Sequence, residues 1–355
     1  MKFSLSSFHF NIKLFLSFAT LYFASYNFDL RILFVWAILL ALLFIKDFFL
    51  LFKKMNYRTL VLCTFLFIYS FFSIAPSIID SDYKGGVENG LYLLFVLIPL
   101  FFTAVLIGKQ TKTNLYTAIT SSFLLLSIII CFVFFQGIID SNRYQQVGNV
   151  LSVLAILFLF NKHFAVKLLF IPIVLIILST GSRQAIFGLL FVGIFYFIKN
   201  YKRPSLFIIP FLAYFLTKLN FIELFRVFEF LNFRTIGRII YKLENVENSR
   251  FDIWKAFIER ISFSPNYVDF GLSRYFMDLP HNFFIEYSYV TGLIFGIPFT
   301  LFIVFSLFKL KCEPYLLAIA LFYFFTFNIS SGLTAAKYFL FLLFLALQRP
   351  KTNTA

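Results

Sequence analysis

Charged residues are scarce in this sequence. Only 13% of the 355 residues are Asp, Glu, Lys or Arg, whereas about a quarter of the residues in a soluble domain are charged. Hydrophobic residues make up 61% of the chain. Apolar stretches of roughly 17 to 25 residues, the length that crosses a bilayer core, recur from end to end. The composition excludes an ordinary soluble domain and predicts an integral membrane protein.

Alternation of apolar and polar residues is also lacking. The strands of a membrane β-barrel would alternate in this way over about ten residues each. The runs here are solidly apolar instead, such as LLFVLIPLFFTAVLIG at 93–108. Backbone groups in lipid must be satisfied within the segment, so these runs predict helices and an all-α fold.

Cysteine and histidine are rare as well. Cys63, Cys131 and Cys312 have neither metal-ligand spacing nor the even-numbered pattern of a disulfide framework. No D-x-D cluster or other metal-ligand spacing occurs at a candidate site. We therefore expect no metal ion, no other cofactor and no structural disulfide.

The apolar runs predict about twelve membrane spans. They lie at 11–27, 30–45, 59–79, 90–107, 115–136, 148–161, 164–180, 183–198, 204–217, 281–308, 314–329 and 333–348. Basic residues gather in every second connection, where acidic residues are almost absent, and this excess is typical of cytoplasmic loops. We expect both termini on the cytoplasmic side of the membrane. The net charge of +15 then reflects orientation and not nucleic-acid binding.

One segment outside the spans is long. Residues 217–280 follow the ninth span on the periplasmic side, within a single membrane domain at 1–355. In its second half Trp254, Phe257, Ile258 and Ile261 share one face at helical spacing. We expect this segment to form a small helical cap over the outer end of the bundle.

Two arginines are candidate anion ligands. Arg183 follows a Ser-Thr-Gly-Ser turn between the seventh and eighth spans, and a helix entered from such a turn offers free N–H groups to phosphate. Arg250 lies in the first turn of the predicted loop helix, where a cation opposes the helix dipole, so an anionic ligand or a partner such as Glu247 would explain it. The alternatives are an interfacial anchor for Arg183 and a solvated surface charge for Arg250.

A histidine begins the tenth span. His281 follows Pro280 at the outer surface, and its near-neutral pKa suits a base that takes a proton from a sugar hydroxyl. The alternative is a histidine that only caps the helix. Glu286 lies about one turn deeper, with Asn282 on the same face. A carboxylate at that depth is expected to be paired or protonated.

Three stretches, in this order, resemble the O-antigen polymerase and ligase superfamily, of the Wzy and WaaL type. They are SRQAIFGLL at 182–190, SRFDIWKAFIERISFSPNYVDFG at 249–271 and HNFFIEYSYVTGLIFG at 281–296. The matching region covers about a third of the chain. The single Gly271 after Pro265 departs from the family pattern, and the spacing after Gly292 departs from the ligase branch, which favours a polymerase.

The resemblance implies transfer of a glycan from an undecaprenyl-pyrophosphate-linked oligosaccharide at the periplasmic face, without a metal. It implies His281, Arg250 and Arg183 as catalytic residues, and Asn282, Glu286, Arg274 and Gln184 as substrate-binding residues. The acceptor would be a second lipid-linked repeat unit in a polymerase, or a lipid A core sugar in a ligase. Besides the lipid bilayer, a chain-length regulator and a flippase of the same pathway would be partners.

Two other classes of protein remain as alternatives. A flippase or secondary transporter predicts charges at mid-depth and discontinuous helices near the centre of the bilayer. The charges in this sequence gather instead at the ends of the spans. A non-catalytic assembly factor is the remaining alternative.

Overall fold

The computed structural model is all-helical in the residues it describes. These are 11–12, 14–19, 22, 57–79, 112–137, 144–201, 227, 233–244, 250–265, 282–308, 310, 313–330 and 337–348. Helix accounts for 89% of them and no strand occurs among them, which confirms the all-α fold class. The helices are α4 (Tyr57–Ile79), α6 (Lys112–Phe135), α7 (Tyr144–Leu159), α8 (Phe164–Leu168), α9 (Phe170–Thr180), α10 (Arg183–Asn200), α13 (Arg234–Glu244), α14 (Arg250–Ile258), α16 (Phe283–Thr291), α17 (Leu293–Phe308), α18 (Pro314–Ser330) and α19 (Lys337–Gln348).

Two of these helices are long and apolar enough to cross a membrane. The qualifying segments are Tyr57–Ala75 in α4 and Leu115–Phe135 in α6. Shorter apolar helices lie at Tyr144–Leu159, Phe164–Thr180, Leu293–Phe308 and Pro314–Thr326. The predicted spans at 30–45, 90–107 and 204–217 lie outside the described residues. The number of twelve spans, the place of the large loop and the position of the termini stay predictions.

The chain divides into two compact units, which we describe one at a time. Unit 1 comprises Met1–Ser122, Arg250–Glu313 and Phe327–Ala355, and unit 2 comprises Phe123–Ser249 and Pro314–Thr326. The single membrane domain expected from the sequence stays a prediction.

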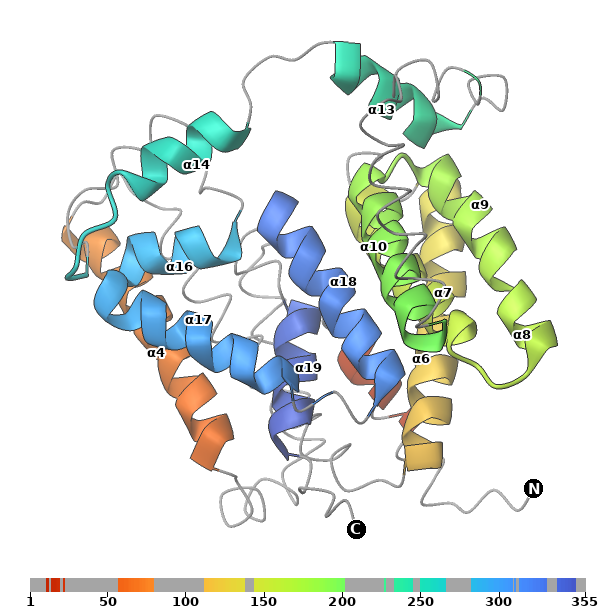
Figure 1. The fold of residues 1–355 in the computed structure, drawn as a ribbon, viewed down its shortest axis with the longest axis horizontal. Helices are drawn as coiled ribbons and strands as arrows, with labels where there is room; N and C mark the ends of the chain where they lie inside the picture. Colours follow the sequence, from red (N-terminus) through yellow and green to blue (C-terminus); the bar gives the residue numbers. More distant parts are fainter. Residues whose placement is uncertain are drawn as a thin grey trace. The chain divides into compact units, whose positions relative to one another are not determined.

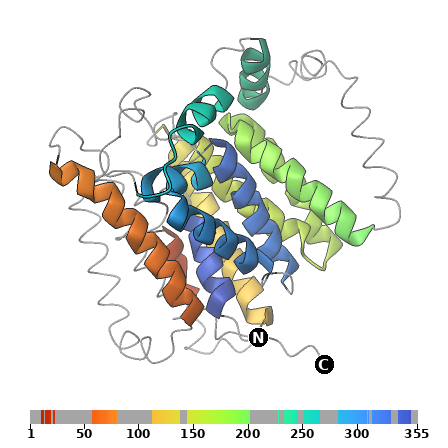
Figure 2. The same cartoon turned by 60° about the vertical axis from the view of Figure 1, so that its left-hand side comes forward.

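An aromatic core holds unit 1 together. The ring of Tyr287 on α16 stacks on that of Phe299 on α17, with centroids 3.8 Å apart. Phe65 on α4 lies 5.7 Å from Phe299, and Phe283 lies 5.6 Å from Phe339 on α19. Figures 1 and 2 both show α4, in orange, beside the blue helices of this unit. Aromatic pairs add about 0.5–1.5 kcal/mol each beyond the area they bury, so this core fixes the four helices together.

A buried carboxylate joins α4 to α16. The Glu286 side chain is 1% exposed, and its Oε1 accepts a hydrogen bond from the Tyr69 hydroxyl at 2.5 Å. Burial of a carboxyl group is costly unless the group is hydrogen-bonded. The sequence-based expectation that Glu286 would be paired or protonated agrees with this contact.

The predicted tenth span is not one helix. It is broken at Gly292, whose φ of 74° and ψ of 167° belong to a backbone region that only glycine adopts readily. The amides of Leu293 and Ile294 donate to the carbonyls of Ser262 and Phe263, at 3.0 and 3.1 Å. The backbone groups freed by the break are therefore satisfied by the chain that follows α14, as an apolar environment requires.

Unit 2 is built around α7. Every residue of α7 from Val147 to Phe158 is buried, and Figure 1 shows α9 and α10 packed beside this helix. The short amphipathic helix α13 lies across the ends of α9 and α10, where the Thr235 hydroxyl donates to the Ile177 carbonyl at 3.3 Å. Gly148 on α7 leaves room for Ser182, because an added Cβ would come within 2.5 Å of the serine Oγ.

The predicted seventh span is also interrupted. Its residues form α8 and α9, with a turn at Leu169 between them. Pro172 explains the position of the turn, because proline lacks an N–H donor and its ring clashes with the carbonyl four residues earlier, at Leu168. Two other helix ends have common capping residues. Gly181, with φ of 93°, follows the C-terminus of α9, and Asn282 caps the N-terminus of α16.

We predict that Tyr69→Phe destabilises the protein by about 1–3 kcal/mol, because the buried Glu286 carboxyl loses a hydrogen-bond donor. The measurement is reversible SDS unfolding of the purified protein in detergent. Tyr57→Phe, at a tyrosine that is 66% exposed on the same helix, is the control and should change the unfolding free energy little. Equal stability of the two variants would contradict a structural role for the pair.

We predict that Gly292→Ala destabilises the protein by about 2–4 kcal/mol, because the Cβ would lie 2.5 Å from the Ser264 backbone in a glycine-only conformation. Gly193→Ala in α10 is the matched control, since nothing lies within 4 Å of its Cβ position. This second variant should be neutral or stabilising by roughly 0.5–1 kcal/mol. Unfolding curves recorded side by side compare them, and a neutral Gly292→Ala would show that the break is not required.

Candidate anion-binding site

Three arginines come together at one end of unit 2. Arg183 is the first residue of α10, and Arg234 and Arg238 are spaced four apart on α13, which places them on one side of that helix. Tyr144, the first residue of α7, lies among them. We call Arg183, Arg234 and Arg238 the arginine cluster.

The Tyr144 ring is the centre of the cluster. The guanidinium carbon of Arg238 lies 3.9 Å from the ring centroid, and Nη2 of the same group donates to the tyrosine hydroxyl at 2.5 Å. The Arg234 guanidinium carbon lies 5.9 Å from the same ring. Nη1 of Arg183 donates to the Arg238 backbone carbonyl at 3.3 Å. A cation over an aromatic face is attracted by the ring quadrupole, so Tyr144 orders the two arginines of α13.

Gly181 makes space for one of these arginines. It ends α9 in the left-handed conformation, and a Cβ at this position would lie 3.2 Å from Cγ and Cδ of Arg234. The Arg234 side chain therefore lies over the turn that leads into Arg183. The turn at 180–183, which the sequence predicts to bind an anion, therefore also contacts a second arginine, Arg234.

Arg183 lies in a stretch without carboxylates, since the sequence contains no Asp or Glu between Asp140 and Glu223. Within the described part of the chain, the interactions of these three arginines include no ion pair. Like charges so close together repel one another, and Arg183 is also partly buried. A ligand with several anionic oxygens would relieve this repulsion and could accept bidentate hydrogen bonds from the guanidinium groups.

Polar side chains also lie directly beneath the cluster. Nε2 of Gln184 lies 3.4 Å from Oδ1 of Asn149 on α7, and the Ser182 Oγ is buried without a hydrogen-bond partner among the described residues. Ser182 precedes α10, but its hydroxyl makes no capping bond to the first turn of that helix. The expected substrate-binding residue Gln184 is thus next to the cluster, with its amide turned toward α7.

Asn282 and Glu286, two candidate site residues of unit 1, make hydrogen bonds that stabilise that unit. Oδ1 of Asn282 accepts from the amides of Phe284 and Ile285, each at 3.1 Å, and its Nδ2 donates to the Asn328 carbonyl at 2.9 Å. Glu286 is buried against Tyr69. Both residues therefore have structural roles in unit 1, and substrate contacts by either of them stay predictions.

The remaining predicted site residues are only partly described. Arg250 is the first residue of α14, but its side chain, like His281 and Arg274, lies outside the described residues. The Phe257 ring of α14 packs on Tyr289 of α16 with centroids 4.8 Å apart. Figure 1 shows the two helices running in the same direction, so Arg250 and Asn282 begin them at the same end.

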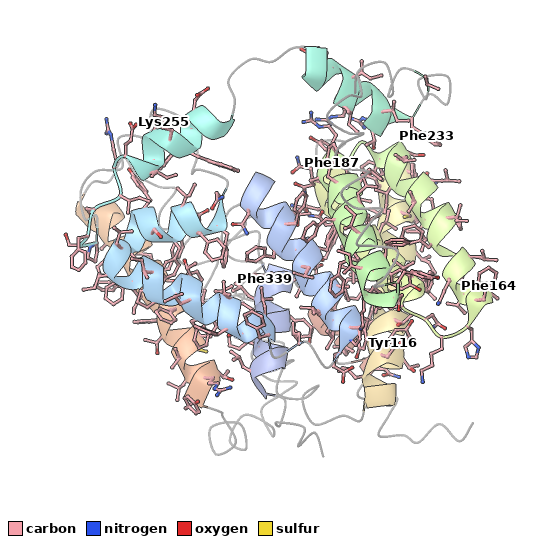
Figure 3. The ribbon with its side chains drawn as sticks, in the orientation of Figure 1. Tyr116, Phe164, Phe187, Phe233, Lys255 and Phe339 are labelled. Atoms are coloured by element: carbon pink, nitrogen blue, oxygen red, sulfur yellow. The ribbon has the colours of Figure 1, made fainter. Side chains whose placement is uncertain are left out.

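The expected loop helix is shorter than the sequence pattern indicated. Helix α14 ends at Ile258, so Ile261 lies beyond it and does not share a helical face with Trp254. Phe257 is fully buried, whereas Lys255 extends away from the helix in Figure 3. Ile258, also predicted on the buried face, is 53% exposed. Of the four residues of that face, Phe257 alone is fully buried.

Comparisons with known proteins do not assign this chain to a family. No protein-family model, curated protein or solved structure matches it. Among the described residues, no group of three His, Cys, Asp or Glu side chains could hold a metal ion. Inferences about function therefore rest on the arginine cluster and its surroundings.

We predict that Tyr144→Leu lowers the affinity for inorganic pyrophosphate by roughly tenfold, because the Arg238 guanidinium loses its aromatic support. Tyr144→Phe keeps the ring and loses only the hydroxyl, so it should bind more tightly than the leucine variant. Isothermal titration calorimetry of the purified protein measures both. Tyr57→Leu, in an exposed position of unit 1, is the control, and equal affinities for all three variants would show that Tyr144 does not order the cluster.

Proposed function

We propose that this protein is a membrane glycosyltransferase that polymerises undecaprenyl-pyrophosphate-linked oligosaccharide repeat units into a surface polysaccharide, such as O-antigen, at the periplasmic face of the inner membrane. The arginine cluster is the observation that carries the proposal. It is a site for a multiply charged anion at the end of apolar helices, and a lipid pyrophosphate is an anion of that kind.

The arginines would act on the donor. Arg183, Arg234 and Arg238 hold the pyrophosphate and stabilise the negative charge that grows as the bond to the sugar breaks. Planar guanidinium groups suit this role because they remain charged and present paired donors to phosphate oxygens. No metal is required in this scheme.

The histidine would act on the acceptor. His281 takes the proton from an acceptor hydroxyl, whose oxygen attacks the anomeric carbon from the side opposite the pyrophosphate. The new glycosidic bond forms as the carbon–oxygen bond to the phosphate breaks, so the anomeric configuration inverts. Undecaprenyl pyrophosphate leaves with the electron pair, and the proton stays on the histidine. The family resemblance implies Arg250 as a further contact of the leaving group.

A ligase would use the same donor site. Only the acceptor differs, since a ligase transfers the glycan to a lipid A core sugar. The departures from the ligase pattern near Gly271 and Gly292 favour the polymerase.

The helix break at Gly292 does not favour the transporter alternative. Discontinuous helices in transporters present unpaired backbone amides to an anionic substrate. Here the amides of Leu293 and Ile294 donate to Ser262 and Phe263. These two amides already have hydrogen-bond partners within the protein, so they are not available to bind a substrate.

We predict that His281→Ala and Arg250→Ala variants insert normally but make no long polysaccharide, because the first lacks the base and the second lacks a leaving-group contact. The measurement is gel analysis of polysaccharide extracted from cells in which the variant replaces the native protein. Arg183→Lys should also be impaired, since a point charge lacks the bidentate fork.

Arg260→Gln is the control for these substitutions, because Arg260 is an exposed arginine that follows α14. It should give the native chain lengths. Native chain lengths in His281→Ala or Arg250→Ala would refute the proposed chemistry, whereas loss of polysaccharide in the control as well would show that the assay reports insertion and not catalysis.

A further inference from the structure

A second group of cations lies at the opposite end of α10. Lys162 and His163 are exposed in the turn between α7 and α8, Lys167 lies in α8, and Lys199 is exposed in the last turn of α10. We call Lys162, Lys167 and Lys199 the lysine cluster. All three belong to unit 2.

Tyr196 connects the elements that carry these lysines. The Lys167 Nζ donates to the Tyr196 hydroxyl at 3.2 Å, and the Phe160 ring at the end of α7 packs edge-on against Tyr196 with centroids 5.1 Å apart. Lys199 is one turn further along α10 from Tyr196, and Lys162 is two residues after Phe160. The contacts of one tyrosine therefore bring three lysine-bearing elements together.

This end of unit 2 also exposes large apolar side chains. Phe164 is 74% exposed and Leu168 is 48% exposed, both on α8. Figure 3 shows Phe164 projecting away from the helices of the unit. A short helix with lysines beside exposed aromatic and aliphatic residues is typical of a segment that lies at a membrane surface.

Helix dipoles explain only part of this arrangement. A cation at a helix C-terminus is favourable, which accounts for Lys162 after α7 and Lys199 in α10. The dipole does not account for the exposed Phe164, nor for the contact of Lys167 with a tyrosine on another helix. The interval without any Asp or Glu, from Asp140 to Glu223, includes this end as well, so the negative charge must come from outside that stretch.

The length of α10 separates the two cation clusters. Its 18 residues span about 27 Å at the rise of an α-helix, which is close to the ~30 Å thickness of a bilayer core. With the arginine cluster at one membrane surface, the lysine cluster lies near the other. The phosphates of anionic lipids are the abundant negative groups at that surface.

We propose that the lysine cluster binds the phosphate of an anionic phospholipid, with Phe164 and Leu168 among its acyl chains. Ammonium groups on flexible stems can follow a mobile headgroup, and clusters of lysines beside apolar helices attract anionic lipids in this way. The inference does not depend on the proposed enzymatic activity, because it concerns the other end of unit 2.

The test is native mass spectrometry of protein released from nanodiscs that contain phosphatidylglycerol and phosphatidylcholine in equal amounts. The native protein should retain phosphatidylglycerol in preference to phosphatidylcholine. The triple variant Lys162→Gln, Lys167→Gln, Lys199→Gln should retain about tenfold less phosphatidylglycerol. The exposed pair Lys162→Gln, Lys199→Gln should retain several-fold less, whereas the matched control Lys255→Gln, Arg260→Gln, at two exposed residues of unit 1, loses the same charge and should retain the native amount.

Two outcomes would overturn the proposal. Undiminished phosphatidylglycerol in the lysine variant would show that the lipid binds elsewhere. Equal losses in Lys162→Gln, Lys199→Gln and in Lys255→Gln, Arg260→Gln would show a response to net charge alone. The exposed pair Lys162→Gln, Lys199→Gln is the substitute if the triple variant does not fold, and it should still lose several-fold of the bound lipid. Replacement of all three lysines by arginine should preserve the retention.

Discussion

The repulsion among three clustered arginines is the constraint on which this end of unit 2 depends. Two guanidinium groups of α13 lie over one tyrosine ring, and the third, that of Arg183, donates to the backbone of the same helix. The aromatic face of Tyr144 and the carbonyl of Arg238 offset part of the repulsion. An anion bound by the guanidinium groups would offset more of it, so this end of unit 2 is suited to binding.

In unit 1, by contrast, several polar groups are paired within the unit. The Glu286 carboxyl, the Asn282 amide and the backbone freed at Gly292 all have hydrogen-bond partners within the unit. Buried polar groups that are satisfied in this way rigidify a structure. Asn282, Glu286 and Gly292, in the stretch at 281–296 that the sequence predicts to be catalytic, therefore have structural roles in unit 1.

Where the structure describes the predicted spans they are helical, because long apolar runs favour helices, but the breaks within them were not predicted. Pro172 and Gly292 are visible in the sequence, but proline and glycine are tolerated inside membrane helices, and only tertiary contacts decide whether a helix ends there. Arg183 could be found because a local turn precedes it. Arg234 and Arg238 were missed because their partner, Tyr144, is distant in the chain; the one sequence signal was their spacing on an amphipathic segment.

The choice of cation differs between the two ends of α10, and the difference has a physical reason. A guanidinium group is planar and offers paired donors, so it favours one orientation of a bound phosphate. An ammonium group is a compact charge on a flexible stem, so it tolerates a headgroup that moves and exchanges. The proposed transferase would need its leaving group held in one orientation, while the proposed lipid site would need to accept headgroups that exchange. Arginines around Tyr144 suit the first requirement at one end of α10, and lysines around Tyr196 suit the second at the other.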